Sequence, residues 1–315
     1  MPVLGILSYT LAVPTLKDGV RFYEDAGLEA KLEANVATLR CPSQDHPSIV
    51  LIGGAERKRL GHVTLRAADL DGIAAGVPRA GGKIVPTSSV NDSGLWVSDP
   101  HGILYHLVER AADPMPLPAP VFEINAPGRI VRTGRSALKP IGQYPAVRPR
   151  RLGHVLLFTP NVMSSVSFLT EALGMGLADR AQDIIAFCCV RQNSDHHVVA
   201  FAKSPAIGFH HGSFQVEDPD EVGRGGRELV ASARRGVWGF GRHTIGSNFF
   251  HYIQDPWGSW FEYYSDMDHI EDYALWTPTN YGMEDSLASW GPQVPPDFVH
   301  NYEAAELAFG CNQLV

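Results

Sequence analysis

The stretch RLGHVLLFTPN, at residues 151–161, nearly repeats the stretch RLGHVTLRAAD at residues 59–69. Both alternate in the manner of a half-buried strand. Two weaker copies share this pattern, GILSYTLAVP at residues 5–14 and FHHGSFQVEDPD at residues 209–220. Four copies of one strand predict a fold built from an internal repeat, which decides the architecture before any other feature does.

A segment with helical spacing follows each repeated strand, and three shorter strand-like segments follow each helix. The four helical segments are LKDGVRFYEDAGL, LDGIAAGVPRAG, MSSVSFLTEALGM and EVGRGGRELVASARRG. Apolar segments such as VATLRCP and IIAFCCV provide the remaining strands. The sequence therefore predicts an α+β fold of two similar halves, each built from two βαβββ units that form a barrel-like mixed sheet.

A second repeat pairs the units into halves. The segment SDPHGILYHLVE around Asp99 resembles QDPWGSWFEYYSD around Asp255, and both contain an Asp-Pro-x-Gly turn between two strands. Proline fixes φ in such a turn and glycine supplies the positive φ. We expect an N-terminal half at 1–110, a proline-rich linker at 111–150, a C-terminal catalytic half at 151–264, and a tail at 265–315 that covers the site.

The composition excludes several classes of partner. The formal net charge of −8 gives no basic face for nucleic acid. No apolar run approaches the roughly 18 residues of a membrane helix, and the N-terminus lacks the features of a secretory signal. The four cysteines have no zinc spacing. We expect a cytoplasmic protein that acts on a small molecule and forms a homo-oligomer.

Two histidines and a glutamate stand at matching places in the repeat. His154 and His211 occupy the same position in paired strands, and this register favours His211 over His210. Glu262 lies seven residues after Asp255 (262 − 255 = 7). Two imidazoles and one carboxylate on three strands form a facial triad, which leaves open positions on Fe(II) and also accepts Mn(II). The ordinary alternatives are packed histidines and a glutamate that faces solvent.

The same register gives the equivalent positions of the first half as Tyr9, His62 and His106, the last of these seven residues after Asp99 (99 + 7 = 106). No carboxylate is present among them. We therefore expect a degenerate metal site in the first half, with a vestigial Tyr9/His62/His106 metal site as the alternative.

The segment GRHTIGSNFFHYIQDPWGSWFE, residues 241–262, resembles the signature of the type I extradiol ring-cleavage dioxygenases, which belong to the vicinal oxygen chelate superfamily. The positions that fit the signature are His243, Tyr252, Asp255, Pro256, Gly258 and Glu262. One position departs from it, because His251 stands where the family has an apolar residue. The resemblance covers both halves and extends to a tail of the family's usual kind.

This resemblance implies an Fe(II)-dependent dioxygenase that cleaves a catecholic or trihydroxylated ring next to the diol, giving a ring-opened semialdehyde-type acid. Among family members, the chain looks most like the catechol-type enzymes, with the cleavage of 2,4,5-trihydroxytoluene as the nearest guess. The family pattern makes His197, rather than His196, the acid–base residue, and makes His243 and Tyr252 hydrogen-bond partners of the substrate. We expect further residues in the pocket or around the ligands, namely His210, His251, Asn248, Trp238 and Phe249.

Two other functions fit the same fold. A glyoxalase-type lyase or isomerase uses a similar metal cage without redox chemistry, but it carries a fourth ligand that this sequence lacks. A module that sequesters ligands without metal would have no use for the triad. Both stay as alternatives at this point.

Overall fold

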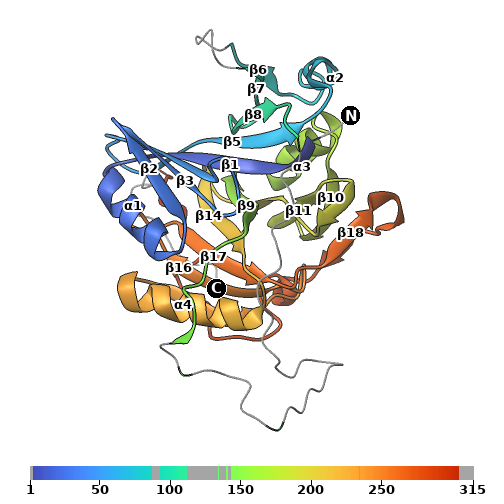
Figure 1. The fold of residues 1–315 in the computed structure, drawn as a ribbon. Coiled ribbons are helices and arrows are strands. Elements are labelled where there is room, and N and C mark those ends of the chain that lie inside the picture. The colour runs from blue at the N-terminus through green and yellow to red at the C-terminus, as the bar shows by residue number, and fades with distance from the viewer. Residues whose placement is uncertain are drawn as a thin grey trace, which may run out of the picture.

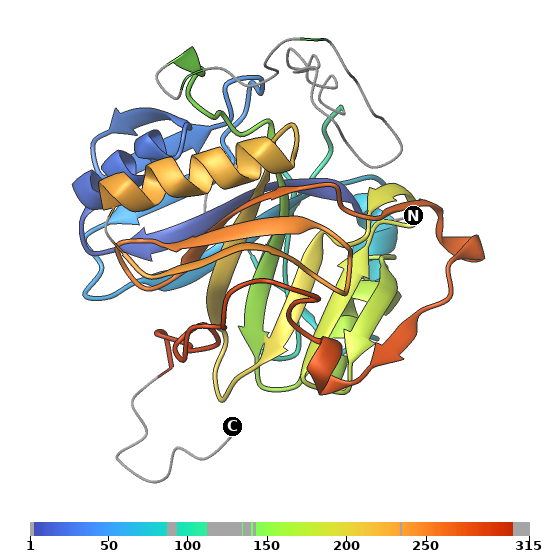
Figure 2. The same cartoon turned by 90° about the horizontal axis from the view of Figure 1, so that it is seen from below.

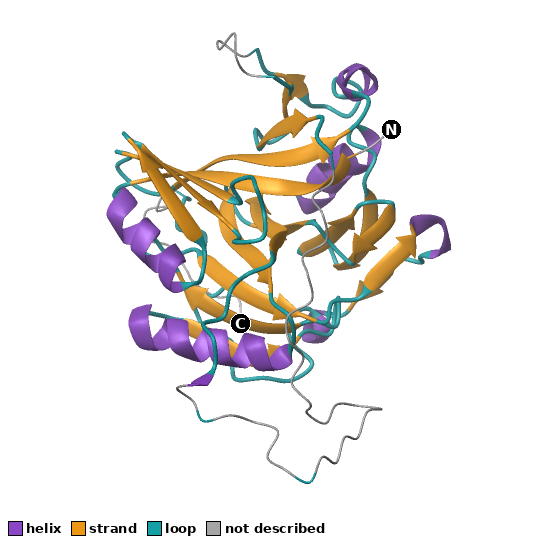
Figure 3. Cartoon of the chain, viewed as in Figure 1, coloured by secondary structure: helices purple, strands orange, loops and turns teal. Residues whose placement is uncertain are grey.

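The structure, a computed structural model, describes residues 3–86, 93–111, 134, 140, 143–233 and 235–304. Most of the linker predicted at 111–150 and the end of the tail at 305–315 lie outside the described residues. The described strands form two large mixed sheets and a separate two-stranded ribbon (Figures 1 and 3).

The first sheet has the strand order β2-β3-β4-β1-β5-β8-β7-β6. Its strands are β1 (Val3–Val13), β2 (Glu29–Glu33), β3 (Val36–Arg40), β4 (Ile49–Gly53), β5 (Arg59–Ala67), β6 (Lys83–Ile84), β7 (Leu95–Ser98) and β8 (Leu104–Val108). The helices of this half are α1 (Leu16–Asp25) and α2 (Leu70–Gly76).

The second sheet has the strand order β15-β16-β17-β14-β9-β13-β11-β10-β19. Its strands before the tail are β9 (Arg151–Thr159), β10 (Gly176–Ala181), β11 (Ile185–Cys189), β13 (Val199–Lys203), β14 (Gly208–Gln215), β15 (Val237–Arg242), β16 (Phe249–Gln254) and β17 (Trp260–Ser265). The helices of this half are α3 (Val162–Glu171) and α4 (Pro219–Ala233).

The tail adds structure that has no counterpart in the first half. Its strand β18 (His269–Asp272) pairs with β12 (Gln192–Asp195), and β19 (Thr279–Tyr281) extends the second sheet beside β10. Two short 3₁₀ helices, η2 (Tyr273–Leu275) and η3 (Met283–Asp285), separate these segments.

Without β19, the two sheets share one strand order: β10-β11-β13-β9-β14-β17-β16-β15 matches β2-β3-β4-β1-β5-β8-β7-β6 position by position. The pairing directions match as well, since β1 with β4 and β9 with β13 are parallel, whereas β1 with β5 and β9 with β14 are antiparallel. The predicted fold class of two halves, each of two βαβββ units, is confirmed.

The two Asp-Pro-x-Gly turns join the halves. In each turn one carboxylate oxygen of the aspartate accepts two backbone N–H groups of its own turn. The other oxygen of Asp99 accepts the Ser165 hydroxyl of α3 at 2.7 Å, and that of Asp255 accepts the Tyr23 hydroxyl of α1 at 3.3 Å. Each turn is therefore tied to a helix of the opposite half, and α1 also lies beside α4 (Figure 2).

Among the described residues, no helix is long and apolar enough to cross a bilayer. Cys41, Cys188 and Cys189 are buried and free, whereas Cys311 lies outside the described residues. The cytoplasmic location and the homo-oligomer stay predictions.

Candidate active site

Three neighbouring strands in the centre of the second sheet carry the predicted metal ligands. In the order β17-β14-β9 they place Glu262, His211 and His154, whose ligand atoms all lie within 4.8 Å of one another. Glu262 Oε2 is 3.2 Å from His154 Nε2 and 3.6 Å from His211 Nε2. All three side chains are buried. The register of the repeat thus brings together the residues that the sequence singles out.

The donor set fits a divalent metal ion. Within the described part of the chain, His211 Nε2 and Glu262 Oε2 are buried without a hydrogen-bond partner, an arrangement that costs free energy unless a ligand satisfies them. Burial and the neighbouring His210 hold the pKa of His211 well below its usual range, so that its imidazole is neutral and able to coordinate.

His210 fixes which nitrogen of His211 is free. The backbone carbonyl of Phe298 accepts from His210 Nε2 at 2.7 Å, so the Nδ1 of a neutral His210 has no proton. This Nδ1 lies 2.6 Å from His211 Nδ1 and accepts a hydrogen bond from its N–H group. The Nε2 of His211 therefore carries no proton, and its lone pair points toward Glu262. His210 therefore lies behind a ligand and orients it.

Glu262 stays ionised in this surrounding. Burial alone would raise the pKa of its carboxyl group, but the imidazoles of His154, His243 and His211 hold this pKa well below its usual range. The Asn248 side chain donates to Glu262 Oε1 at 3.2 Å, while its own Oδ1 is buried without a partner. Asn248 thus hydrogen-bonds to a predicted metal ligand, and its Oδ1 atom can accept a hydrogen bond from a further donor.

His197 lies against the triad. Its ring centroid is 4.1 Å from that of His154, and the side chain lines the same cavity. Burial, followed by the neighbouring imidazoles of His154 and His196, holds the pKa of His197 well below its usual range. A neutral imidazole with one free nitrogen in a buried cavity can accept a proton and return it.

Tyr252 and His243 form a pair on the other side of the triad. The carbonyl of Leu287 accepts from His243 Nδ1, which leaves His243 Nε2 to accept from the Tyr252 hydroxyl at 3.0 Å. Burial and the charge of Glu262 raise the pKa of Tyr252, so its hydroxyl keeps its proton. Trp238 does not line the cavity; it stacks behind Tyr252, with ring centroids 5.4 Å apart.

A cavity of about 550 Å³, including its open mouth, connects these groups. Its polar lining is His154, His197, His210, His211, His243, Asn248, Tyr252 and Ser286, and its apolar lining is Leu156, Ile185, Phe187, Ala202, Ile245, Leu287, Phe298 and Val299. Among the described residues, this lining contains no lysine or arginine. The tail residues of this lining, Ser286, Leu287, Phe298 and Val299, could not be predicted from the sequence, because the tail has no repeat partner from which a register could be taken.

Two predicted pocket residues face away from the cavity. Neighbours in a strand point to opposite faces, and Tyr252 on β16 takes the cavity side. His251 therefore points toward α4, where a Cβ atom on Gly226 would collide with its ring. Phe249 shares that face and stacks on Phe240 at 5.5 Å. The prediction that His251 and Phe249 belong to the pocket is wrong, because the family signature carries no information on strand alternation.

The structure also corrects the first-half set. In the second half, His154 pairs with the residue two places after His211. In the first half, the residue two places after His62 is Thr64, and its strand partner is Ser8. The helices agree, because α3 begins 146 residues after α1 (162 − 16 = 146), and 154 − 146 = 8. Ser8, rather than Tyr9, is the counterpart of His154.

Tyr9 points to the opposite face of β1 and packs between the halves. Its ring centroid is 4.4 Å from that of Phe209, and a Cβ atom on Gly212 would lie 2.5 Å from its ring. Tyr9 is therefore a packing residue, and the proposed Tyr9/His62/His106 metal site is wrong as a set. His62 and His106 do lie in matching register, with ring centroids 6.2 Å apart.

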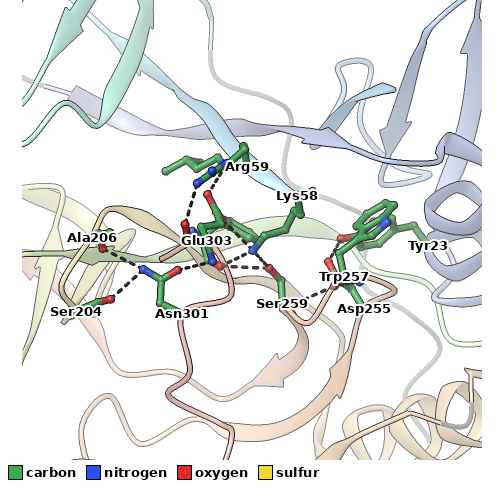
Figure 4. A network of polar contacts seen from close by, with 12 residues as sticks. Tyr23, Lys58, Arg59, Ser204, Ala206, Asp255, Trp257, Ser259, Asn301 and Glu303 are labelled. Atoms are coloured by element: carbon green, nitrogen blue, oxygen red, sulfur yellow. Dashed lines mark hydrogen bonds and ion pairs between the residues drawn. The ribbon is translucent and has the colours of Figure 1, made fainter. Parts of the chain in front are cut away.

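A buried polar network fastens the tail to both halves (Figure 4). Lys58, from the first half, lies 2.9 Å from Glu303 Oε1 and donates to the Phe209 carbonyl and to Ser259. Glu303 also accepts the backbone N–H groups of Leu60 and Phe209, at 2.6 and 2.8 Å. Lys58 and Glu303 are 5% and 4% exposed. This pair holds the tail beside the strand that carries His211.

Comparison with known proteins places the chain in a family. Metapyrocatechase 2 from Cupriavidus necator is 38% identical over 313 residues, which cover 96% of this chain and 93% of that protein. The profile of the Glyoxalase/Bleomycin resistance protein/Dioxygenase superfamily matches residues 151–263. The chain belongs to the type I extradiol dioxygenases of this superfamily.

Solved structures share the fold of this dioxygenase. The 2,3-dioxygenase LapB from Pseudomonas sp. KL28 superimposes with a TM-score of 0.70 at 22% identity, covering 90% of this chain and 99% of that one. A Mn(II)-bound glyoxalase from Novosphingobium aromaticivorans gives 0.71 at 22% identity, covering 97% and 99%. These likenesses show the fold alone. The predicted family and extradiol ring cleavage are confirmed, and neither alternative function is supported by the relative that spans the chain.

Proposed function

We propose that this extradiol dioxygenase holds Fe(II) with His154, His211 and Glu262 and cleaves an uncharged, alkyl-substituted catechol with O2. The observation that carries the proposal is the convergence of three ligand atoms on one buried point beside a cavity with an apolar wall; two of these atoms, His211 Nε2 and Glu262 Oε2, have no hydrogen-bond partner. Fe(II) in such a triad supplies open coordination positions at which a diol and O2 meet, together with an electron for oxygen activation.

The surrounding side chains handle the protons. We assign His197 as the acid–base residue, because its Nδ1 faces His196 and its Nε2 is left for the substrate hydroxyl. Tyr252, which donates to His243, keeps lone pairs on its hydroxyl oxygen that accept from the second hydroxyl of the diol. Tyr252 lies on β16 and His197 in the segment between β12 and β13, so we assign one hydroxyl of the diol to each.

The wall of the cavity supports the choice of substrate. A carboxylate on the ring would lose its hydration and meet no lysine or arginine among the lining residues, whereas a methyl group would lie against side chains such as Phe187 and Leu287. A third hydroxyl has partners in Ser286 and in the unsatisfied Oδ1 of Asn248. These contacts suit 2,4,5-trihydroxytoluene as well as methylcatechols.

Oxygen uptake by protein loaded anaerobically with Fe(II) or Mn(II) tests the proposal. We expect kcat/KM for 4-methylcatechol and for 2,4,5-trihydroxytoluene to exceed that for 3,4-dihydroxyphenylacetate by about 100-fold, because an unpaired buried carboxylate costs several kcal/mol. Equal rates with the carboxylated ring would contradict the substrate class. Higher turnover with Mn(II) than with Fe(II) would contradict the assignment of Fe(II) as the metal.

A further inference from the structure

A buried carboxylate stands behind the histidine pair at the start of β13. Asp179 Oδ2 is 2.7 Å from His196 Nε2, and His196 Nδ1 is 3.1 Å from His197 Nδ1. His196 is fully buried and Asp179 is 3% exposed. The three groups form one chain that leads from the interior of the second sheet to the cavity.

The donors and acceptors of this chain can be assigned. An ionised carboxylate only accepts, so His196 Nε2 carries a proton and donates to Asp179. The Nδ1 of a neutral His196 then has a lone pair, which accepts from His197 Nδ1. The remaining nitrogen of His197, Nε2, has no proton and is available on the side of the cavity. One carboxylate thereby fixes the tautomers of two successive imidazoles.

Asp179 is itself held in place. Its Oδ1 accepts the backbone N–H of Thr279 at 2.6 Å, at the point where β19 of the tail joins β10. The side chain of the adjacent Arg180 turns away and pairs with Asp183. Among the described residues, the ion pair of Asp179 is with His196. The carboxylate is therefore committed to the imidazole and has no competing cation.

The first half has a histidine at the position of His196 but lacks the hydrogen-bonded series of side chains. Val199 pairs with Val155 as Ile49 pairs with Tyr9, so His196 and His197 correspond to His46 and Pro47. There the histidine Nδ1 contacts the Pro47 carbonyl, and no second imidazole follows. The half without a metal triad thus also lacks the residue that would need orienting.

We infer that Asp179 and His196 are positioning residues that fix the tautomer and ring orientation of His197 for proton transfer with the substrate. The inference rests on the proposed role of His197. A carboxylate that orients an imidazole base is a recurrent device in enzymes, and its removal costs turnover more than binding.

Two substitutions of His196 separate positioning from folding. In His196→Gln, the amide nitrogen can donate to Asp179 while its oxygen accepts from His197, so we expect kcat within about fivefold of the parent. In His196→Leu both bonds are lost, and we expect kcat to fall about 10- to 100-fold with KM within about threefold. Bound iron, measured independently of turnover, stays stoichiometric in both. Equal losses in the two variants would overturn the inference.

Asp179→Asn has a matched control in Asp183→Asn, since both carboxylates lie at β10 or directly after it and only Asp179 faces His196. We expect a loss of about tenfold in kcat for Asp179→Asn and none for Asp183→Asn. The loss for Asp179→Asn should shrink with 4-nitrocatechol, whose acidic hydroxyl needs less help from a base. A loss of the same size with both substrates would indicate a merely structural role and overturn the inference.

His197→Ala distinguishes the two proposals. If this variant keeps full turnover, the acid–base role of His197 in the proposed function fails, and the inference fails with it. If it loses turnover while His196→Leu and Asp179→Asn do not, the proposed function stands and the inference alone is wrong.

Discussion

The two halves share their strands, their order and their pairing, yet among the described residues only the second brings together three side chains that could hold a metal. At four matching positions the second half has His154, His211, Glu262 and Tyr252, whereas the first has Ser8, His62, His106 and Trp96. In the first half the indole of Trp96 stacks on His106 at 4.4 Å and lies 4.6 Å from His62. The backbone pairing is the same in both halves although the chemistry differs, because the hydrogen bonds between the strands do not depend on these side chains.

The first half has instead become a support for the second. Tyr9 fills the space above Gly212, next to the ligand His211, and Lys58 holds the tail through Glu303. A half without a metal triad among its described residues can thus still contribute to the site, through packing and one buried charge.

The largest difference between the halves should appear on removing the matched residues Glu262 and His106. Glu262→Gln should abolish stoichiometric iron binding and lower turnover by at least about a thousandfold, because Glu262 is the one carboxylate in the proposed ligand set. His106→Gln should leave iron content and turnover within about twofold. Metal analysis measures the iron content and oxygen uptake measures the turnover of both variants. Iron retained by Glu262→Gln would contradict the proposed difference between the two halves.

A second test breaks the support from the first half. Lys58→Met leaves Glu303 buried without its partner and should lower the free energy of unfolding by about 3 to 5 kcal/mol. Urea denaturation measures this loss, and adding Glu303→Gln should recover part of it. The control is Lys31→Met, whose pair with Glu33 is exposed and should contribute less than about 1 kcal/mol. Equal effects of the two substitutions would show that the tail is not held by this pair.

A third test concerns His251, on the face of β16 that points away from the cavity. Burial lowers its pKa to about 4, whereas in the unfolded chain it is near 6.5. The unfolded state therefore takes up the proton first, and the native state loses about 2 to 3 kcal/mol as pH falls from 6.5 to 4. His251→Gln should remove this part of the acid sensitivity. Parallel stability curves for parent and variant between these pH values would contradict the burial of a neutral imidazole.

The smallest effect is expected at Tyr9. Tyr9→Phe removes a hydroxyl that hydrogen-bonds with Tyr23 and should cost about 1 kcal/mol of stability. Iron content and turnover should not change, since Tyr9 points away from the matching positions of the first half. A drop in bound iron would restore the idea of a ligand at this position.

Much of the site was predictable from the sequence because the repeat is strong. The paired LGHV segments fix the register of His154, and the Asp-Pro-x-Gly turns fix that of Glu262, so the three ligands follow from counting along the chain. The same counting failed at Tyr9, because GILSYTLAVP matches its partner weakly and a shift of one residue reverses the face of a strand.

The remainder depended on contacts that the repeat does not encode. The carbonyls of Leu287 and Phe298 orient two histidines of the site, but the tail has no partner segment that would place it. The hydrogen-bonded series from Asp179 to His197 joins β10 to the segment before β13, and these come together only because both strands pair with β11. A buried lysine such as Lys58 resembles a surface residue in sequence, since its partner Glu303 lies far along the chain.

The anchoring of the tail by Glu303 also sets an order of events during biosynthesis. A ribosome delivers the N-terminal half first and the tail last. The three proposed metal ligands therefore leave the ribosome before Phe298 and Glu303, and His210 lacks its carbonyl partner until Phe298 has been made. A nascent chain stopped ahead of this point would carry all three proposed ligands, but His210 would lack the carbonyl through which it orients His211. We therefore expect the proposed capture of a metal to follow the synthesis of the tail through Phe298.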